Sequence, residues 1–270
     1  MNKERLGDPT KLGNANAMAH AASQLLYRAA AANIVPLSGD EHSNLGWDVA
    51  SRSFQTRALN DAGTIVELSL SPLVLNIGGD KLPLETVSIE TAISLLDAKL
   101  AALGLKSASS APIPYDLPAN VMSLQIFEAV DGLDALAAWY DLAASTLNQF
   151  ARDLGDITPG PSEVRCWPHH FDIATYVSLE AGDAEEARGI GIGLSPGDGS
   201  YAEPYFYVNP WPSVAPEKLP APVTPGHWHT EGFVGSVATG SEIMSLQDVS
   251  AGSSMFVQRS FDVGRKLLGF

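Results

Sequence analysis

Hydrophobic and polar residues follow two different periods along this chain, and these periods predict where helices and strands lie. Apolar residues at three- and four-residue steps predict helices over 14–32, 89–103, 133–154 and 253–268. Alternation at every second position predicts strands over 47–59, 64–77, 164–179, 189–194, 203–209 and 227–237. Asn14 and Ser88 stand where they could cap the first two helices, and Gly104 stands where the second helix would end.

The predicted elements follow the order helix, strand, strand, helix, and this order occurs twice. One half would cover residues 1–120 and the other residues 121–270, which allows two similar halves, although no residue-level repeat relates them. A single continuous domain is the alternative. In either case we expect an α+β fold, in which helices pack on the apolar faces of one or two antiparallel sheets.

The strand predicted over 189–194 separates its residue types completely between its two faces. Side chains alternate along a strand, so isoleucine and leucine occupy one face. The other face carries only Gly189, Gly191 and Gly193. Glycine inside a strand is unfavourable unless something needs the space. That space would serve a ligand, neighbouring tyrosine rings, or the close approach of a helix.

The neighbouring strands also have one apolar and one polar face. If every apolar face looks toward the helices, the polar faces coincide around the glycines. The side chains gathered there would be His170, Asp172, Tyr176, Glu203, Tyr205, Tyr207, Asn209, His227, His229 and Glu231. By the same alternation, His169 would face the core. We therefore expect a functional site on the polar surface of the second half.

His227 and His229 are the residues best placed to bind a metal ion. Histidines two positions apart on a strand lie roughly 6.6 Å apart at Cα, so their rings can converge on one ion such as Zn²⁺ or Fe²⁺. Glu231 would lie roughly 13 Å from His227 along an ideal strand, so a third ligand should come from another strand. The simplest candidates for that ligand are His170, Asp172 and Glu203.

These residues predict a cytoplasmic enzyme that acts on a small polar substrate, with or without a metal ion. Glu203, Glu231 or Asp172 would act as the catalytic carboxylate, because a carboxylate near histidines can accept and return protons. Substrate would be positioned by Tyr205, Tyr207, Asn209 and Tyr176. The alternative is a protein without chemistry, in which histidines and acids form a hydrogen-bonded network that binds a small ligand or serves only the structure.

Composition and charge narrow the classes of partner. The 270 residues are 45% apolar and 17% charged, as in a globular protein, and the net charge is −15. Such an acidic surface repels phosphate backbones and anionic lipids, so we expect a small-molecule partner and neither nucleic acid nor membrane. Cys166 is the single cysteine, so no internal disulfide can form, and a polar start without an export signal agrees with a cytoplasmic protein.

Two unusual strings, Trp-Pro-His-His-Phe-Asp at 167–172 and Glu-Pro-Tyr-Phe-Tyr at 203–207, resemble those of a bacterial family of uncharacterised proteins. That family has the same order of helices and sheets, and a segment ending in Phe-Asp opens its second sheet. The resemblance extends from about Trp47 to the last helix. Smaller residues can stand at His169 and His170 in the family, which weakens a catalytic role for these two. The resemblance implies an α+β fold and no particular activity.

Overall fold

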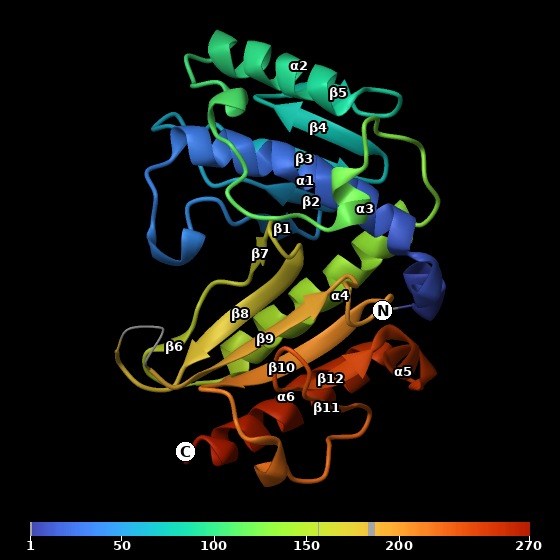
Figure 1. Ribbon diagram of the computed structural model, residues 1–270, viewed down its shortest axis with the longest axis vertical. Coiled ribbons are helices and arrows are strands. Elements are labelled where there is room, and N and C mark those ends of the chain that lie inside the picture. Colours follow the sequence, from blue (N-terminus) through green and yellow to red (C-terminus); the bar gives the residue numbers. More distant parts are fainter. Residues whose placement is uncertain (1, 156, 183–186) are drawn as a thin grey trace. The chain divides into compact units, whose positions relative to one another are not determined.

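The chain folds into two compact units in a computed structural model that describes residues 2–155, 157–182 and 187–270 (Figure 1). Unit 1 contains Met1–Thr10, Leu142–Val164 and Asp172–Phe270. Unit 2 contains Lys11–Asp141 and Arg165–Phe171. Each unit combines an antiparallel sheet with helices, so the predicted α+β fold is confirmed. The halves predicted over 1–120 and 121–270, and their similarity, stay predictions.

The sheet of unit 2 is a five-stranded antiparallel meander in the order β1-β2-β3-β4-β5. Its strands are β1 Gly46–Asp48, β2 Ser53–Gln55, β3 Val66–Leu70, β4 Leu73–Ile77 and β5 Asp80–Pro83. Turns therefore divide both strands that the sequence predicted here. Within β3 the alternation is as predicted, because Val66, Leu68 and Leu70 are all buried while the residues between them are half-buried.

Two long helices contact this sheet, α1 (Gly13–Asn33) at β3 and α2 (Ile89–Ala102) at β4 (Figure 1). The Ser88 hydroxyl caps α2 as predicted, because it accepts a hydrogen bond from the amide of Thr91. The predicted cap at Asn14 is wrong, since α1 already begins one residue earlier. The other elements of unit 2 are η3 (Ser38–Asp40), η4 (Ala108–Ser110), α3 (Ala119–Met122) and β7 (Arg165–Trp167).

Unit 1 has an antiparallel sheet whose strands follow the order β11-β12-β10-β9-β8-β6. The strands are β6 Gly160–Pro161, β8 Asp172–Ser178, β9 Gly189–Ser195, β10 Tyr205–Trp211, β11 His227–His229 and β12 Gly235–Thr239. The C-terminal helix α6 (Val249–Leu267) packs on β9 and β10 and buries Phe256 and Phe261 (Figure 1). The remaining elements are η1 (Lys3–Leu6), η5 (Pro216–Lys218) and α5 (Gly240–Ser245).

Two elements do not belong wholly to one unit. The helix α4 (Leu133–Asp153), predicted over 133–154, contributes Leu133–Asp141 to unit 2 and the rest to unit 1. The 3₁₀ turn η2 (Pro9–Lys11) likewise crosses the division after Thr10. Of the helices within the described ranges, none has both the length and the apolar content that a membrane span requires.

The strand predicted over 164–179 is interrupted, and this changes where the first two histidines lie. The strand β7 ends at Trp167, and the amide of Phe171 donates to the Trp167 carbonyl at 2.7 Å, which closes a turn over 168–171. Pro168 favours this break because proline has no amide hydrogen to give to a sheet. Strand alternation therefore does not reach His169, and its predicted place on the core face of one continuous strand is wrong.

The strand predicted over 227–237 is also interrupted. It forms two short strands, β11 and β12, which pair with each other antiparallel, with His227 opposite Val237 and His229 opposite Gly235. The reversal between them contains Gly232 at φ 88°, a conformation that glycine adopts without strain. Glu231 therefore lies in the reversal and not on a strand.

Candidate functional site

Six aromatic side chains of unit 1 make a connected set, which we name the aromatic cluster. Its members are Tyr201, Tyr205, Tyr207, His227, His229 and Phe233. The strand β10 supplies two tyrosines, β11 supplies both histidines, and the other two members come from loops. Ring centroids of neighbouring members lie between 4.2 and 6.5 Å apart. The polar residues predicted on β10 and β11 are thus brought together, with two additional rings between them.

The glycine face of β9 is occupied by side chains of the neighbouring strands. A Cβ added at any of these glycines would lie within 2.3–2.5 Å of a side-chain oxygen. The side chains concerned are Tyr176 at Gly189, Asn209 at Gly191 and Tyr207 at Gly193. Of the explanations that the sequence left open, the structure favours neighbouring side chains over space for a ligand. Tyr176 and Asn209, predicted to position substrate, therefore cover the sheet.

Carboxylates engage both tyrosines of β10. The hydroxyl of Tyr205 donates to Asp198 at 2.5 Å, and the hydroxyl of Tyr207 donates to Asp172. Burial, followed by the bond to Asp198, raises the pKa of the Tyr205 phenol, which keeps it protonated as a donor. Asp172 lies at the start of β8, so the sequence placed it correctly beside the tyrosines. Its predicted catalytic role stays a prediction.

The two glutamates predicted as bases lie elsewhere in unit 1. The carboxylate of Glu203 accepts from the amide and the hydroxyl of Ser241 at 2.6 and 2.7 Å, which ties it to the start of α5. The side chain of Glu231 is exposed, and its backbone carbonyl, not its carboxylate, is the group that bonds the His229 ring. Both carboxylates thus keep structural or solvent contacts, and their catalytic roles stay predictions.

The two histidines of β11 converge on one atom, the hydroxyl oxygen of Tyr201. This oxygen lies 2.8 Å from Nε2 of His227 and 2.9 Å from Nδ1 of His229. Asp198 holds Tyr201 in place, because its carboxylate accepts from the Tyr201 amide at 3.2 Å while its own amide donates to the Tyr201 carbonyl. The convergence predicted for these rings is present, and a phenol stands at the meeting point.

The third predicted metal ligand, His170, lies in unit 2, so the three predicted ligands do not share a unit. It belongs to a second group of histidines, in which its ring lies 4.3 Å from that of His169. Nε2 of His20 donates to the carbonyl of Pro168 at 2.8 Å, and Gln24 donates to the same oxygen. The pKa of His20 is lowered to about 4, mainly by burial, which the hydrogen bond to Pro168 opposes and the charges of His170 and His169 reinforce.

Neither histidine group completes a metal site of the ordinary kind. Within the part of the chain that the structure describes, no three histidine, cysteine, aspartate or glutamate side chains are grouped so that they could hold an ion. The predicted site of His227, His229 and His170 with Zn²⁺ or Fe²⁺ is therefore not formed by those residues. Tyrosine is not among these four residue types, so the set completed by Tyr201 is a separate case.

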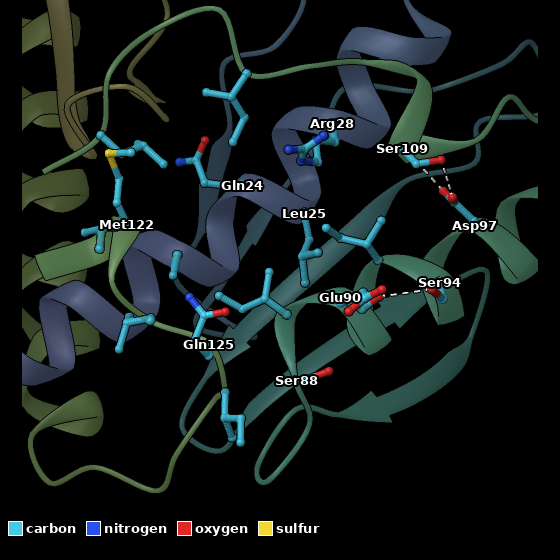
Figure 2. A pocket seen from close by; sticks show the side chains of 18 residues that line it. Gln24, Leu25, Arg28, Ser88, Glu90, Ser94, Asp97, Ser109, Met122 and Gln125 are labelled. Carbon is cyan, nitrogen blue, oxygen red and sulfur yellow. Dashed lines mark hydrogen bonds between the residues drawn. The ribbon is translucent and has the colours of Figure 1, made fainter. Parts of the chain in front are cut away.

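Unit 2 contains a pocket that the sequence did not predict. It has a volume of about 820 Å³ and lies among α1, α2 and the segment between η4 and residue 126 (Figure 2). Ten of its 18 lining residues are apolar, and they include Leu25 of α1, Ile93 of α2 and Met122 of α3. Pockets that bind small organic molecules have volumes of roughly 300–1,000 Å³ and a mostly apolar lining.

The polar groups of this pocket are few and come from both helices. Arg28 is the one cation among the lining residues, and Nη1 of its guanidinium donates to the Ala111 carbonyl at 2.9 Å. On the α2 side, both carboxylate oxygens of Asp97 accept from Ser109, at 3.2 Å from its amide and 2.5 Å from its hydroxyl (Figure 2). The Arg28 fork thus keeps further donors, while the Asp97 carboxylate already accepts from Ser109.

Gln24 connects this pocket with the histidines of unit 2. Its side chain lines the pocket, donates to the Pro168 carbonyl at 2.8 Å and accepts from the hydroxyl of Tyr115 at 2.8 Å. The polar wall beside Gln24 is therefore fixed by a chain of hydrogen bonds. Gln24 and Arg28 are four residues apart, so they lie on the same side of α1.

Three residues of these sites were missed in the sequence. Tyr201 lies between β9 and β10, far from the histidines in sequence, so no spacing connects it with them. Gln24 and Arg28 stand in the alanine-rich first helix, whose apolar pattern predicts only a packed face. Their four-residue spacing is the one feature that could have indicated a polar strip.

Comparisons with known proteins identify no relative of this chain. Neither the family models, nor the curated proteins, nor the solved structures include a match to this chain. The resemblance to an uncharacterised bacterial family therefore stays a prediction, and the function must be argued from the chain's own residues.

Proposed function

We propose that unit 2 binds a small amphipathic carboxylate, whose apolar body fills the pocket and whose carboxylate contacts Arg28. The observation that carries the proposal is the pocket itself, a volume of about 820 Å³ with a mostly apolar lining. Moving apolar surface from water into such a site is favourable by about 25 cal/mol per Å². The unit 1 face lacks this support, because its side chains cover the sheet and pair with one another.

Arg28 supports an anionic head group. An arginine fork has five donors and matches a carboxylate with two parallel hydrogen bonds. Among the described residues, the one hydrogen bond that Arg28 makes is to Ala111, so the fork has donors to offer a ligand. Asp97 does not compete for this fork as an available partner, because Ser109 occupies both of its oxygens.

The enzyme predicted from the sequence, with a His/carboxylate site and Zn²⁺ or Fe²⁺, stays a prediction. The contacts of Asp172, Glu203 and Glu231 support instead the alternative, a small-ligand-binding protein without chemistry at those carboxylates. The cytoplasmic location stays a prediction as well.

Calorimetric titration with decanoate tests the proposal. Burying nine carbons at about 0.8 kcal/mol each gives about 7 kcal/mol, so we expect a Kd on the order of 10 µM and one site. Decylamine, with the same chain and the opposite charge, should bind more weakly because it meets Arg28. The substitution Ile93→Trp places a bulky ring among the apolar lining residues and should weaken binding.

The control is Arg259→Gln on the exposed side of α6, which removes the same charge from unit 1. It should leave the titration unchanged. Binding of decanoate by the Ile93→Trp protein as tightly as by the wild type would contradict the proposed site. Equal binding of decanoate and decylamine would contradict the role of Arg28.

A further inference from the structure

Two histidines of unit 1 place ring nitrogens within hydrogen-bond distance of one tyrosine oxygen, so three atoms that can bind a metal lie together. The Tyr201 oxygen lies 2.8 Å from His227 Nε2 and 2.9 Å from His229 Nδ1. The side chain of His227 is 41% exposed, so an ion could reach these atoms from solvent. Imidazole nitrogen and phenolate oxygen both coordinate transition metals.

Each hydrogen bond of this group fixes the position of one hydrogen atom. Nε2 of His229 contacts the Glu231 carbonyl, which can only accept, so that nitrogen carries the hydrogen and Nδ1 offers a lone pair to Tyr201. The phenol of Tyr201 has one hydrogen and donates it to Nδ1 of His229. The contact with His227 then requires a hydrogen on Nε2 of that ring as well.

The second histidine faces a carboxylate with its other nitrogen. Nδ1 of His227 lies 3.8 Å from Oε2 of Glu242, and a carboxylate favours a hydrogen on that nitrogen. A neutral ring has only one hydrogen, so it cannot satisfy both Glu242 and Tyr201. The 3.8 Å separation between Nδ1 and Glu242 is longer than a hydrogen bond, so the one hydrogen bond that His227 makes in this group is to Tyr201.

We propose that His227, His229 and Tyr201 form a binding site for a divalent transition-metal ion of the Cu²⁺ type. The ion takes the place of the phenol hydrogen, and the hydrogen of His227 moves from Nε2 to Nδ1, on the side of Glu242. All three ligand atoms then direct a lone pair at the ion. The Tyr201 proton leaves to solvent, and no electron is transferred. This site is independent of the carboxylate pocket in unit 2.

The spacing of the ligand atoms selects the kind of ion. An ion about 2.0–2.1 Å from each atom sees neighbours 2.8–2.9 Å apart at an angle of about 90°. A tetrahedral Zn²⁺ site would instead separate its ligand atoms by about 3.3 Å. Angles of about 90° and nitrogen and oxygen ligands are typical of Cu²⁺ and Ni²⁺, and Cu²⁺ binds most tightly in that series.

The surroundings of the three ligands are those of a metal site. Histidine ligands usually donate their second ring N–H to a carbonyl or a carboxylate. The Glu231 carbonyl has this position for His229, and the Glu242 carboxylate lies 3.8 Å from the second nitrogen of His227. The charges of Asp198, Glu242 and Glu231 all reach the Tyr201 hydroxyl. This negative field attracts a cation and favours its retention.

Titration of the full-length protein with Cu²⁺, followed by visible absorption and calorimetry, tests the site. A phenolate bound to Cu²⁺ gives a charge-transfer band that histidine ligands alone do not give. We expect one tight equivalent and such a band in the wild type. The substitution Tyr201→Phe should remove the band and weaken binding at least about tenfold, and His229→Gln should weaken binding by a similar factor.

Two controls separate this site from other copper ligands. Tyr176→Phe removes a tyrosine of the same sheet that is outside the cluster, and His170→Ala removes the exposed member of the histidine pair of unit 2. Both should keep the band and the tight equivalent. Circular dichroism verifies that each variant is folded. The proposal is overturned if the wild type gives no band, or if His170→Ala removes the tight equivalent while Tyr201→Phe and His229→Gln keep it.

Discussion

The aromatic cluster of unit 1 and the pocket of unit 2 differ in how their polar groups and their space are used. In the cluster, hydroxyls, carboxylates and ring nitrogens bond to one another, and side chains fill the space above Gly193. In the pocket, about 820 Å³ is available and the polar groups are few. A gathering of polar residue types therefore marks where hydrogen bonds form, whereas a site for a small organic molecule also needs unfilled volume.

The largest difference should come from enlarging one side chain in each region and comparing the loss in unfolding free energy. A Cβ at Gly193 would lie 2.5 Å from the Tyr207 oxygen and 2.8 Å from the Cβ of Ala174, and the latter cannot swing aside. We expect Gly193→Val to lower the free energy of unfolding by about 4 kcal/mol, from overpacking and loss of strand pairing. Ile93→Phe in the pocket should change it by less than about 1 kcal/mol. Urea unfolding measures both, and equal losses would contradict the contrast.

Acid should destabilise unit 2 through its buried histidine. The folded pKa of His20 is about 4, below the ordinary value of 6.5. Between about pH 6.5 and 4, His20 is therefore protonated in the unfolded chain and neutral in the folded chain. Stability falls as the pH falls through this range. The loss from His20 is about 3 kcal/mol. Half-buried His169, with its pKa also lowered to about 4 by burial, adds to it.

The control for this acid effect is His20→Gln, because glutamine can donate to the Pro168 carbonyl without titrating. Urea midpoints of this variant should depend less on pH between 7 and 4 than those of the wild type. An unchanged pH dependence in the variant would show that His20 does not cause the loss.

Two tyrosines of unit 1 test whether the cluster is stabilised by its hydrogen bonds. Tyr207→Phe removes the bond to Asp172 and leaves a carboxylate without that donor, so we expect a loss of about 2 kcal/mol in unfolding free energy. The hydroxyl of Tyr176 is buried and has no hydrogen-bond partner among the described residues. Tyr176→Phe should therefore be neutral or slightly stabilising. A larger loss for Tyr176→Phe than for Tyr207→Phe would contradict the stabilising role of the hydrogen bond to Asp172.

The charge of the pocket should have the smallest effect of the four. Arg28→Gln keeps the polarity and most of the length of the side chain but removes the cation. We expect decanoate to bind about tenfold more weakly, which corresponds to about 1.4 kcal/mol. Calorimetry measures the change, and decylamine should gain rather than lose affinity in the same variant. An unchanged decanoate affinity would show that Arg28 does not contact the carboxylate of the ligand.

Local patterns predicted the helices better than the strands. Ser88 and Gly104 bound α2 as expected, because a cap and a left-handed glycine act within a few residues. The two interrupted strands contain turns, which an alternation of apolar and polar residues does not reveal. The turn at Phe171 follows from Pro168, which was visible in the sequence, but its closing bond to Trp167 was not.

The aromatic cluster and the pocket were harder to predict than the strands, because their members are far apart in sequence. Face sorting correctly gathered Tyr205, Tyr207, His227 and His229, because alternation is a local rule. It could not find Tyr201, which reaches the histidines only after the chain has folded over 26 residues. Nor could it find the pocket, whose walls come from α1, α2 and α3.

The most direct test of the contrast between the two regions is a filtered nuclear Overhauser spectrum of bound decanoate. Our account predicts contacts from the decanoate chain to the methyl groups of Leu25, Ile93 and Met122 in unit 2. Contacts to the rings of Tyr207 and Phe233 instead would place the ligand on the aromatic cluster and contradict the account.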